Sequence, residues 1–128
     1  MRAPYLDVAL PVVDPDDIAA SAAAVLLADA PPAAAFSITG PQALTVRAQT
    51  TILGQVLGRE LRTESITEQQ AKDTALPVGT PDLIASSVLA TASPAAAALP
   101  VSGDVQHLTG RAPKTFERWA TEHAAAFG

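Results

Sequence analysis

The sequence contains few side chains that could do acid–base or nucleophilic chemistry, and its tyrosine is the first to consider. A phenol can act as an acid near neutral pH when a lysine four residues further along the chain lowers its pKa. The chain has one tyrosine, Tyr5, and position 9 is alanine. Because the sequence lacks a tyrosine–lysine pair of this spacing, we predict no catalytic residue in it.

The two histidines, His107 and His123, lack a carboxylate partner at a spacing typical of a metal site or a catalytic triad. His123 falls in the expected final helix, where packing or a surface position is the simpler interpretation. His107 precedes Gly110, where a cation near a helix end is stabilised by the helix dipole. No serine lies in a Gly-x-Ser-x-Gly turn. The sequence therefore predicts no metal site and does not indicate a hydrolase.

Three aspartates, Asp14, Asp16 and Asp17, surround Pro15 and could be taken for a cation site or a pair of catalytic carboxylates. Proline suits the first position of a helix, and the residue before it can cap that helix. Acidic side chains in a first turn also face the positive end of the helix dipole. We expect these aspartates to start a helix rather than to do chemistry.

The composition excludes several classes of partner. The net charge is -5, and the eight Lys and Arg residues are scattered along the sequence, so a nucleic-acid footprint is not expected. There is no cysteine to form a disulfide or a zinc thiolate site. The most apolar stretch, 19–28, is much shorter than a membrane span of about 20 residues. We expect no nucleic acid or membrane partner and a cytoplasmic location.

The apolar residues predict an α/β fold. Short apolar segments at 8–13, 35–39 and 61–66 are expected to be strands. Thr45 is expected to cap a helix that ends before Gly58, which suits the left-handed position after a helix. Because this helix separates 35–39 from 61–66, we expect those two strands to be parallel, with a right-handed crossover.

Helices are expected over much of the remaining chain, within a single domain over residues 1–128. Thr67 and Gln70 form a capping-box pattern, and another helix is expected from Leu83. Residues 93–103 are rich in alanine and proline and are expected to be a flexible loop.

A last helix is expected after Thr115, with Phe116, Trp119 and Phe127 on one side. This aromatic face could pack in the core of the chain or dock against another chain. Large apolar side chains are otherwise scarce, so the core should be thin unless another surface covers part of it.

Four segments carry a resemblance to a known family. They are Val-Val-Asp-Pro-Asp-Asp-Ile-Ala at 12–19, Ser-Ile-Thr-Gly-Pro at 37–41, Leu-Gly-Arg at 57–59 and Leu-Thr-Gly-Arg-Ala-Pro-Lys-Thr-Phe-Glu-Arg-Trp at 108–119. In this order and spacing they resemble the C-terminal, substrate-side half of NmrA-like atypical short-chain dehydrogenases. The resemblance implies a fragment of a Rossmann protein, with one strand of the large sheet at 8–13, a small parallel βαβ unit and C-terminal helices.

The resemblance implies NAD(P) as the family's cofactor, bound by a glycine-rich turn in the N-terminal half. The glycines of this sequence do not form such a turn after a strand. We therefore expect no cofactor-binding residue in this chain and no measurable binding of NAD or NADP by the chain alone.

The resemblance also places Tyr5 and the neighbouring Leu6 at the substrate-facing edge. It implies the substrate-side half of an NAD(P)-dependent oxidoreductase or redox sensor, inactive without a nucleotide-binding half. Two alternatives stay open, a non-catalytic ligand-binding or interaction module and a truncated product without a role of its own. The expected partners are a Rossmann-type chain or a second copy, bound through 8–13 and the helix after Pro15, and a small-molecule ligand is compatible with the fold.

Overall fold

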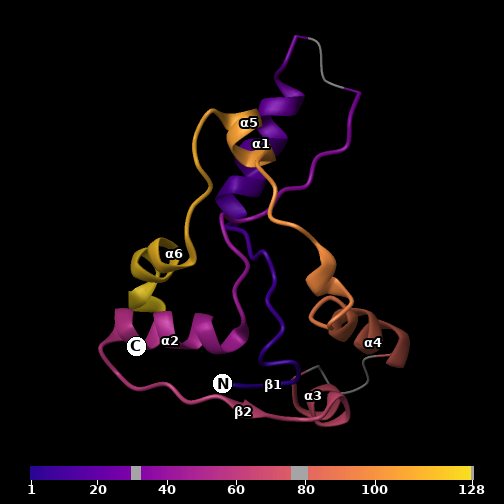
Figure 1. Cartoon of the computed structure of the whole chain (residues 1–128), viewed down its shortest axis with the longest axis vertical. Helices are drawn as coiled ribbons and strands as arrows, with labels where there is room; N and C mark the ends of the chain where they lie inside the picture. The colour runs from indigo at the N-terminus through magenta and orange to yellow at the C-terminus, as the bar shows by residue number, and fades with distance from the viewer. Residues whose placement is uncertain (30–32, 76–80, 128) are drawn as a thin grey trace. The chain divides into compact units, whose positions relative to one another are not determined.

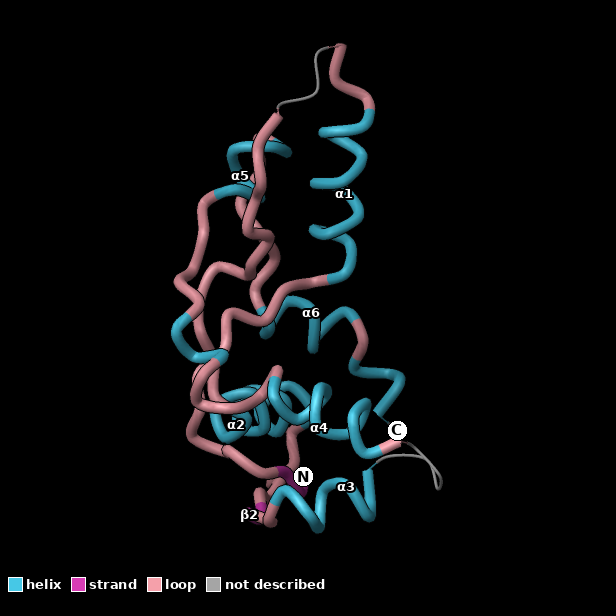
Figure 2. Tube along the Cα trace, turned by 90° about the vertical axis from the view of Figure 1, so that its right-hand side faces the viewer, coloured by secondary structure: helices cyan, strands magenta, loops and turns pink. Residues whose placement is uncertain are grey.

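The computed structural model describes residues 1–29, 33–75 and 81–127, and these are mainly helical with two very short strands (Figures 1 and 2). The strands are β1 (Arg2–Ala3) and β2 (Glu64–Ser65). The helices are α1 (Pro15–Leu26), α2 (Val46–Leu57), α3 (Glu68–Ala75), α4 (Asp82–Ala90), α5 (Asp104–Thr109) and α6 (Phe116–Glu122), with 3-10 turns η1 (Ala96–Ala98) and η2 (Ala124–Phe127). None of the helices in the described ranges is long and apolar enough to cross a membrane.

The chain divides into two compact units, each made of two separate stretches of sequence. Unit 1 contains Met1–Leu10 and Leu44–Leu99, and unit 2 contains Pro11–Ala43 and Pro100–Gly128. The expectation of a single domain over residues 1–128 stays a prediction, and the units are described in turn.

Unit 1 begins with the small sheet. Strand β1 is parallel to β2, with Arg2 opposite Glu64 and Ala3 opposite Ser65. The α/β class expected from the sequence is thus confirmed. The specific pairing of 35–39 with 61–66 is wrong, because the partner of the strand inside 61–66 is the N-terminal β1.

The helix ends in unit 1 follow the local rules closely. The Thr45 hydroxyl accepts the Ala48 N–H at 3.0 Å, and Gly58 ends α2 in the left-handed region with φ 63°. At the start of α3, Thr67 and Gln70 each accept the other's backbone N–H through their side chains, as the capping box predicts. These three predictions are confirmed.

The segment 8–13, which continues from unit 1 into unit 2, does not form the expected strand. Only Leu10 pairs, in an isolated antiparallel bridge with Leu44. The sequence between Asp7 and Asp14 has the apolar character of a buried strand. A strand forms only where a neighbouring strand pairs with it, and among the described residues this segment has a single bridge.

Unit 2 is built around α1, which packs against α5. The segment 35–39, expected to be a strand, forms none and is held instead by hydrogen bonds with residues at and just before the start of α5. The Ser37 N–H donates to Asp104 Oδ2 at 2.8 Å, and the Ser102 N–H donates to Thr39 Oγ1 at 2.9 Å. These bonds take the place of a strand ladder.

A close backbone approach joins two parts of unit 2. A Cβ added to Gly40 would lie 1.9 Å from the carbonyl oxygen of Val12, so only glycine fits there. The chain before α1 and the chain after 35–39 are therefore in direct contact.

The apolar core is thin, as the composition predicts. Val105 is the largest fully buried apolar side chain among the described residues, and Asp17 and Ser21 are the other large ones at that depth. Leu26, by contrast, is 80% exposed at the end of α1. The stretch 93–103, which runs from unit 1 into unit 2, begins with a turn that leads into η1, and its flexibility stays a prediction.

Candidate functional site

The start of α1 carries a buried polar network. Asp14 caps the helix, since its Oδ1 accepts the Asp16 N–H at 2.7 Å, which confirms the capping expected from the sequence. Asp17 does more than complement a dipole. Its side chain is 0% exposed, its Oδ2 accepts the Lys114 backbone N–H at 2.6 Å, and Arg111 Nη2 lies 3.1 Å from its Oδ1. Asp17 therefore anchors the segment before α6 to the first turn of α1.

Lys114 is the cation at the centre of this network, and its side chain is 9% exposed. Its Nζ lies 2.8 Å from Glu122, 3.1 Å from Asp14 and 3.3 Å from Asp16. Asp14 Oδ2 makes no hydrogen bond of good geometry, but this ammonium group balances its charge. One lysine thus connects the ends of α1 and α6.

The network holds its members in their charged forms. Hydrogen bonds from Lys114 and then from Arg118 lower the pKa of Glu122 from its ordinary 4.5 to about 2. The same contact with Glu122, followed by that with Asp14, raises the pKa of Lys114 well above its usual range. Neither group can exchange a proton readily near neutral pH, so these two residues position chain segments rather than do acid–base catalysis.

A cleft of about 190 Å³ lies beside this network, entirely within unit 2. It is lined by Val12, Val13, Asp14, Pro15, Lys114, Thr115, Phe116 and Trp119. The Trp119 ring stacks with Phe116 at 5.4 Å between centroids and with His123 at 5.0 Å, and meets Phe127 edge-on at 6.2 Å. The aromatic residues that the sequence placed on one side of the last helix do therefore lie together.

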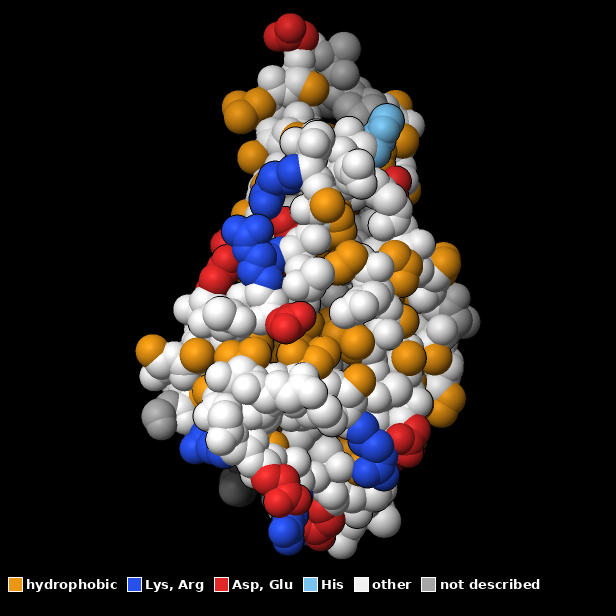
Figure 3. Space-filling model, turned by 60° about the vertical axis from the view of Figure 1, so that its left-hand side comes forward, with side chains coloured by type: hydrophobic (Ala, Val, Ile, Leu, Met, Phe, Trp, Pro, Cys, Tyr) orange, Lys and Arg blue, Asp and Glu red, His pale blue; other side chains and the backbone are white. Residues whose placement is uncertain are grey.

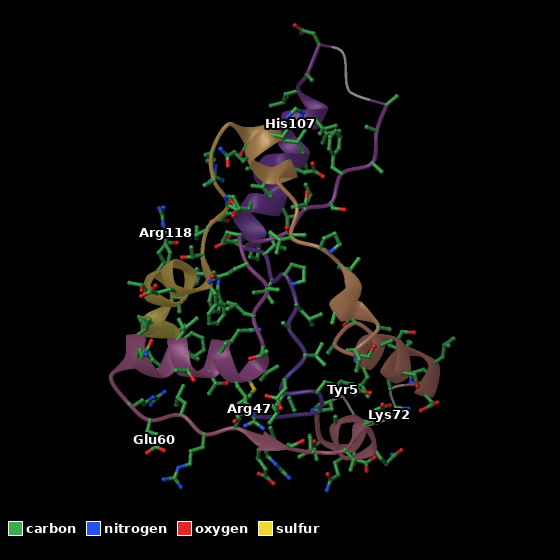
Figure 4. All side chains as sticks on the ribbon, viewed as in Figure 1. Tyr5, Arg47, Glu60, Lys72, His107 and Arg118 are labelled. Carbon is green, nitrogen blue, oxygen red and sulfur yellow. The ribbon has the colours of Figure 1, made fainter. Side chains whose placement is uncertain are left out.

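Tyr5, expected to face the substrate, lies in a turn of unit 1 with φ 55°, which is uncommon for a residue other than glycine (Figure 4). Its hydroxyl donates to Glu68 Oε1, and this bond raises the pKa of Tyr5. Tyr5 is therefore protonated at neutral pH and engaged by Glu68. Leu6 is 3% exposed and belongs to the core of unit 1. The substrate-facing role of both residues stays a prediction.

Arg47 holds the same turn in place from α2. Its Nε is 2.7 Å from Asp7 Oδ1, its Nη1 donates to Thr63 at 3.0 Å, and its backbone N–H donates to the Leu6 carbonyl. Figure 4 shows Arg47 and Tyr5 in unit 1. The uncommon backbone of Tyr5 is thus supported by contacts from α2 and α3.

The two histidines belong to unit 2. His107 is in the last turn of α5, and His123 ends α6, with its Nδ1 2.8 Å from the Trp119 carbonyl oxygen. Within the described ranges, no three His, Cys, Asp or Glu side chains are grouped so that they could hold a metal ion.

On the face shown in Figure 3, Lys and Arg side chains lie beside Asp and Glu side chains rather than in one basic patch.

Sequence reasoning missed the partners of the aspartates. The sequence predicts Asp17 only as an acidic residue of a first helical turn, whereas its bond to Lys114 spans 97 residues. Opposite charges at two helix starts are a signal that could have indicated this bond. Arg111 and Lys114 are cations just before the Thr115 cap, and three aspartates surround the start of α1.

No protein-family profile matches the chain. The chain is 40% identical over 129 residues to the (4-alkanoyl-5-oxo-2,5-dihydrofuran-3-yl)methyl phosphate reductase of Streptomyces griseus, a match that covers 99% of this chain and 45% of that protein. It is 36% identical over 118 residues to the NAD(P)H azoreductase of Xenophilus azovorans, covering 91% of this chain and 41% of the azoreductase. The chain thus resembles NmrA-like NAD(P)-dependent reductases over part of their length.

Solved structures of these reductases have the same fold. An NADPH-dependent quinone oxidoreductase of Escherichia coli, in complex with NADPH, matches 100% of this chain with 45% of its own length, at a TM-score of 0.80 and 18% identity. The triphenylmethane reductase of Citrobacter sp. matches 97% of this chain with 44% of its length, at a TM-score of 0.76 and 20% identity. The chain thus spans less than half the length of the NmrA-like reductases that it matches.

Proposed function

We propose that these residues form the substrate-side portion of an NmrA-like NAD(P)H-dependent reductase, and that residues outside these 128 bind the nucleotide. The observation that carries this proposal is the 40% identity to a reductase over nearly the whole chain. The match to about 45% of that reductase leaves room for a nucleotide-binding portion in the remainder.

The start of α1 does not offer the pyrophosphate of a dinucleotide a suitable site. A pyrophosphate binds where glycine backbone N–H groups and a helix N-terminus face it. At the start of α1, the Asp14 side chain accepts the Asp16 N–H, and Asp16 and Asp17 add negative charge. These carboxylates would repel a phosphate, so no step of hydride transfer is assigned to residues of this chain.

The proposed docking face for the nucleotide-binding portion is a shallow groove of about 390 Å³ beside α1. It is lined by Ile18, Ser21, Ala22, Val25, Leu26, Phe36, Ile38 and Leu108. Leu26 is largely exposed and Ile18 is 47% exposed, so the apolar lining of the groove is open to cover by another surface. This face supports the proposal that a second portion, or a second copy, covers α1.

The test is a chimaera in which this chain replaces the matching residues of the Streptomyces griseus reductase. We expect the purified chimaera to bind NADPH and to oxidise it in the presence of that reductase's own substrate, whereas the 128-residue chain alone does neither. The measurements are calorimetric titration with NADPH and the loss of NADPH absorbance. A folded chimaera that binds NADPH without any turnover would contradict the proposal, as would micromolar binding of NADPH by the chain alone.

The docking face is tested with separate polypeptides. The change Leu26→Asp places a charge in the α1 groove and should weaken capture of the nucleotide-binding portion at least about tenfold, since a buried unpaired carboxylate is costly. Leu83→Asp, at an equally exposed leucine of α4 in unit 1, is the matched control and should leave capture unchanged. Equal effects of the two changes would contradict the assignment of the face.

A second candidate is a non-catalytic ligand-binding or interaction module derived from the same fold. It is favoured by the state of Tyr5 and Glu122, whose pKa values lie away from neutrality in the directions that make proton transfer difficult. The chimaera separates the two candidates, because only the first predicts turnover.

A further inference from the structure

The cleft beside Trp119 is used neither by the proposed docking face nor by the reductase assignment. It lies between the chain segment that leads into α1, which includes Val12 and Val13, and the segment that starts α6. All of its lining residues belong to unit 2. It is therefore a feature of one compact unit.

The aromatic lining of the cleft is fixed before any ligand arrives. Trp119 is clamped by Phe116 and His123, whose rings lie within 28° and 23° of parallel to it. His123 is itself held through its Nδ1 contact with the Trp119 carbonyl oxygen. A preorganised aromatic surface binds flat molecules with little loss of side-chain freedom.

The charges around the cleft select against ions. Lys114 lines it, but its ammonium group is already shared by Asp14, Asp16 and Glu122. Arg118 also pairs with Glu122, and Arg111 pairs with Asp17, so the three cations of the network face four carboxylates. The local sum of charge is therefore negative, and each of these cations is already paired with a carboxylate. Most of the remaining lining is apolar, which favours a neutral ligand.

The volume sets the size of that ligand. A dry engineered cavity of about 150 Å³ in another protein accommodates benzene. The 190 Å³ of this cleft therefore suits one ring or two fused rings and not a dinucleotide.

We propose that the cleft binds a neutral, flat compound of one or two fused rings, packed between the Val13 segment and the Phe116–Trp119 aromatic pair. Binding requires neither NAD(P)H nor the nucleotide-binding portion. The proposal goes beyond the reductase assignment and can fail or succeed separately from it.

The experiment uses the 128-residue chain, 1,4-naphthoquinone as the neutral probe and 1,4-naphthoquinone-2-sulfonate as its anionic counterpart. Trp119 is the chain's one tryptophan, so its fluorescence and its single indole N–H resonance report on the cleft directly. The absence of cysteine removes the thiol with which a quinone would react. We expect saturable quenching and a shift of the indole resonance with the neutral probe, and about fivefold weaker binding of the sulfonate.

Two valine variants locate the site. Val13→Phe adds a ring inside the cleft and should weaken binding at least about tenfold. Val101→Phe makes the same change at an exposed valine of unit 2 that does not line the cleft, and should bind like the unchanged chain. Circular dichroism checks that each variant is folded, and Val13→Leu replaces Val13→Phe if the latter is not.

Several results overturn the proposal. Quenching that rises linearly without saturation shows collision rather than binding, and an unmoved indole resonance places the probe elsewhere. Equal binding by the Val13 and Val101 variants, or a sulfonate that binds as tightly as the neutral quinone, also refutes it. A chain that is dimeric by light scattering and does not bind the probe would show that a second copy fills the cleft instead.

Discussion

Replacing Asp17 by alanine should destabilise unit 2 by about 2–4 kcal/mol. The charge-assisted hydrogen bond from the Lys114 N–H is worth about 1.5–3 kcal/mol, and its loss leaves that partly buried donor without an acceptor. The ion pair with Arg111 adds only about 0–1 kcal/mol, because the Arg111 side chain is half-exposed and water solvates it after the change. Asp17→Asn keeps an acceptor for the N–H and should cost less than alanine.

The assay is urea unfolding followed by tryptophan fluorescence, which reports on unit 2 because Trp119 belongs to it. Arg111→Ala is the matched control and should lower the free energy of unfolding by about 1 kcal/mol or less. The reasoning fails if Asp17→Ala stays within about 0.5 kcal/mol of the unchanged chain. It also fails if Arg111→Ala is as costly as Asp17→Ala, since the exposed ion pair would then be the main contribution.

Three further changes test other parts of the fold. The pKa of Glu122 is lowered from 4.5 to about 2, so its contribution to stability is complete above about pH 4.5 and is lost as the pH falls toward 2. The free energy of unfolding, measured as a function of pH, should show this loss in the unchanged chain and not in Glu122→Gln. Thr45→Ala removes the side-chain cap of α2 and should cost about 1 kcal/mol in thermal or urea unfolding, and an unchanged midpoint would refute the role of the cap. Gly58→Ala should cost about 1 kcal/mol because of its positive φ alone, since a Cβ there meets no atom within 4 Å; a stabilising effect in the same assay would contradict this.

The sequence predicts those parts of the fold that depend on neighbours within a few residues. The start of α1 at Pro15, the Thr45 and Thr115 caps, the left-handed Gly58 and the end of α5 at Gly110 all follow from local chemistry, and the structure has each of them. Caps and turns are specified by hydrogen bonds within one turn of a helix, so no distant residue is needed to predict them.

The strand predictions failed because the partners of a strand are distant in the sequence. Residues 35–39 have the alternation of a strand, yet their polar groups are satisfied by Ser102 and Asp104, more than sixty residues away. The pairing of β1 with β2 likewise joins Arg2 to Glu64. Apolar alternation shows which segments favour an extended backbone, but not which partner completes them.

The candidate sites show the same division. The aromatic side of α6 follows from helical spacing, and its rings do stack. The cleft beside them needs Val12 and Val13, about a hundred residues earlier in the chain, and no spacing rule connects the two. The bond between Asp17 and Lys114 could not be predicted for the same reason, because the two residues are 97 positions apart.

Because unit 2 consists of two separate stretches of sequence, the ribosome makes its two parts at different times. The first stretch carries Asp17, and its partner Lys114 is synthesised 97 residues later, after most of unit 1. At a synthesis rate of about 5–20 residues per second, the Lys114 N–H that donates to this carboxylate is made on the order of 5 to 20 seconds after Asp17. Unit 1 has been synthesised by then, because its last residue is Leu99. A premature stop before Lys114 would therefore leave α1 made but unanchored, and such a product should be an early target for proteolysis.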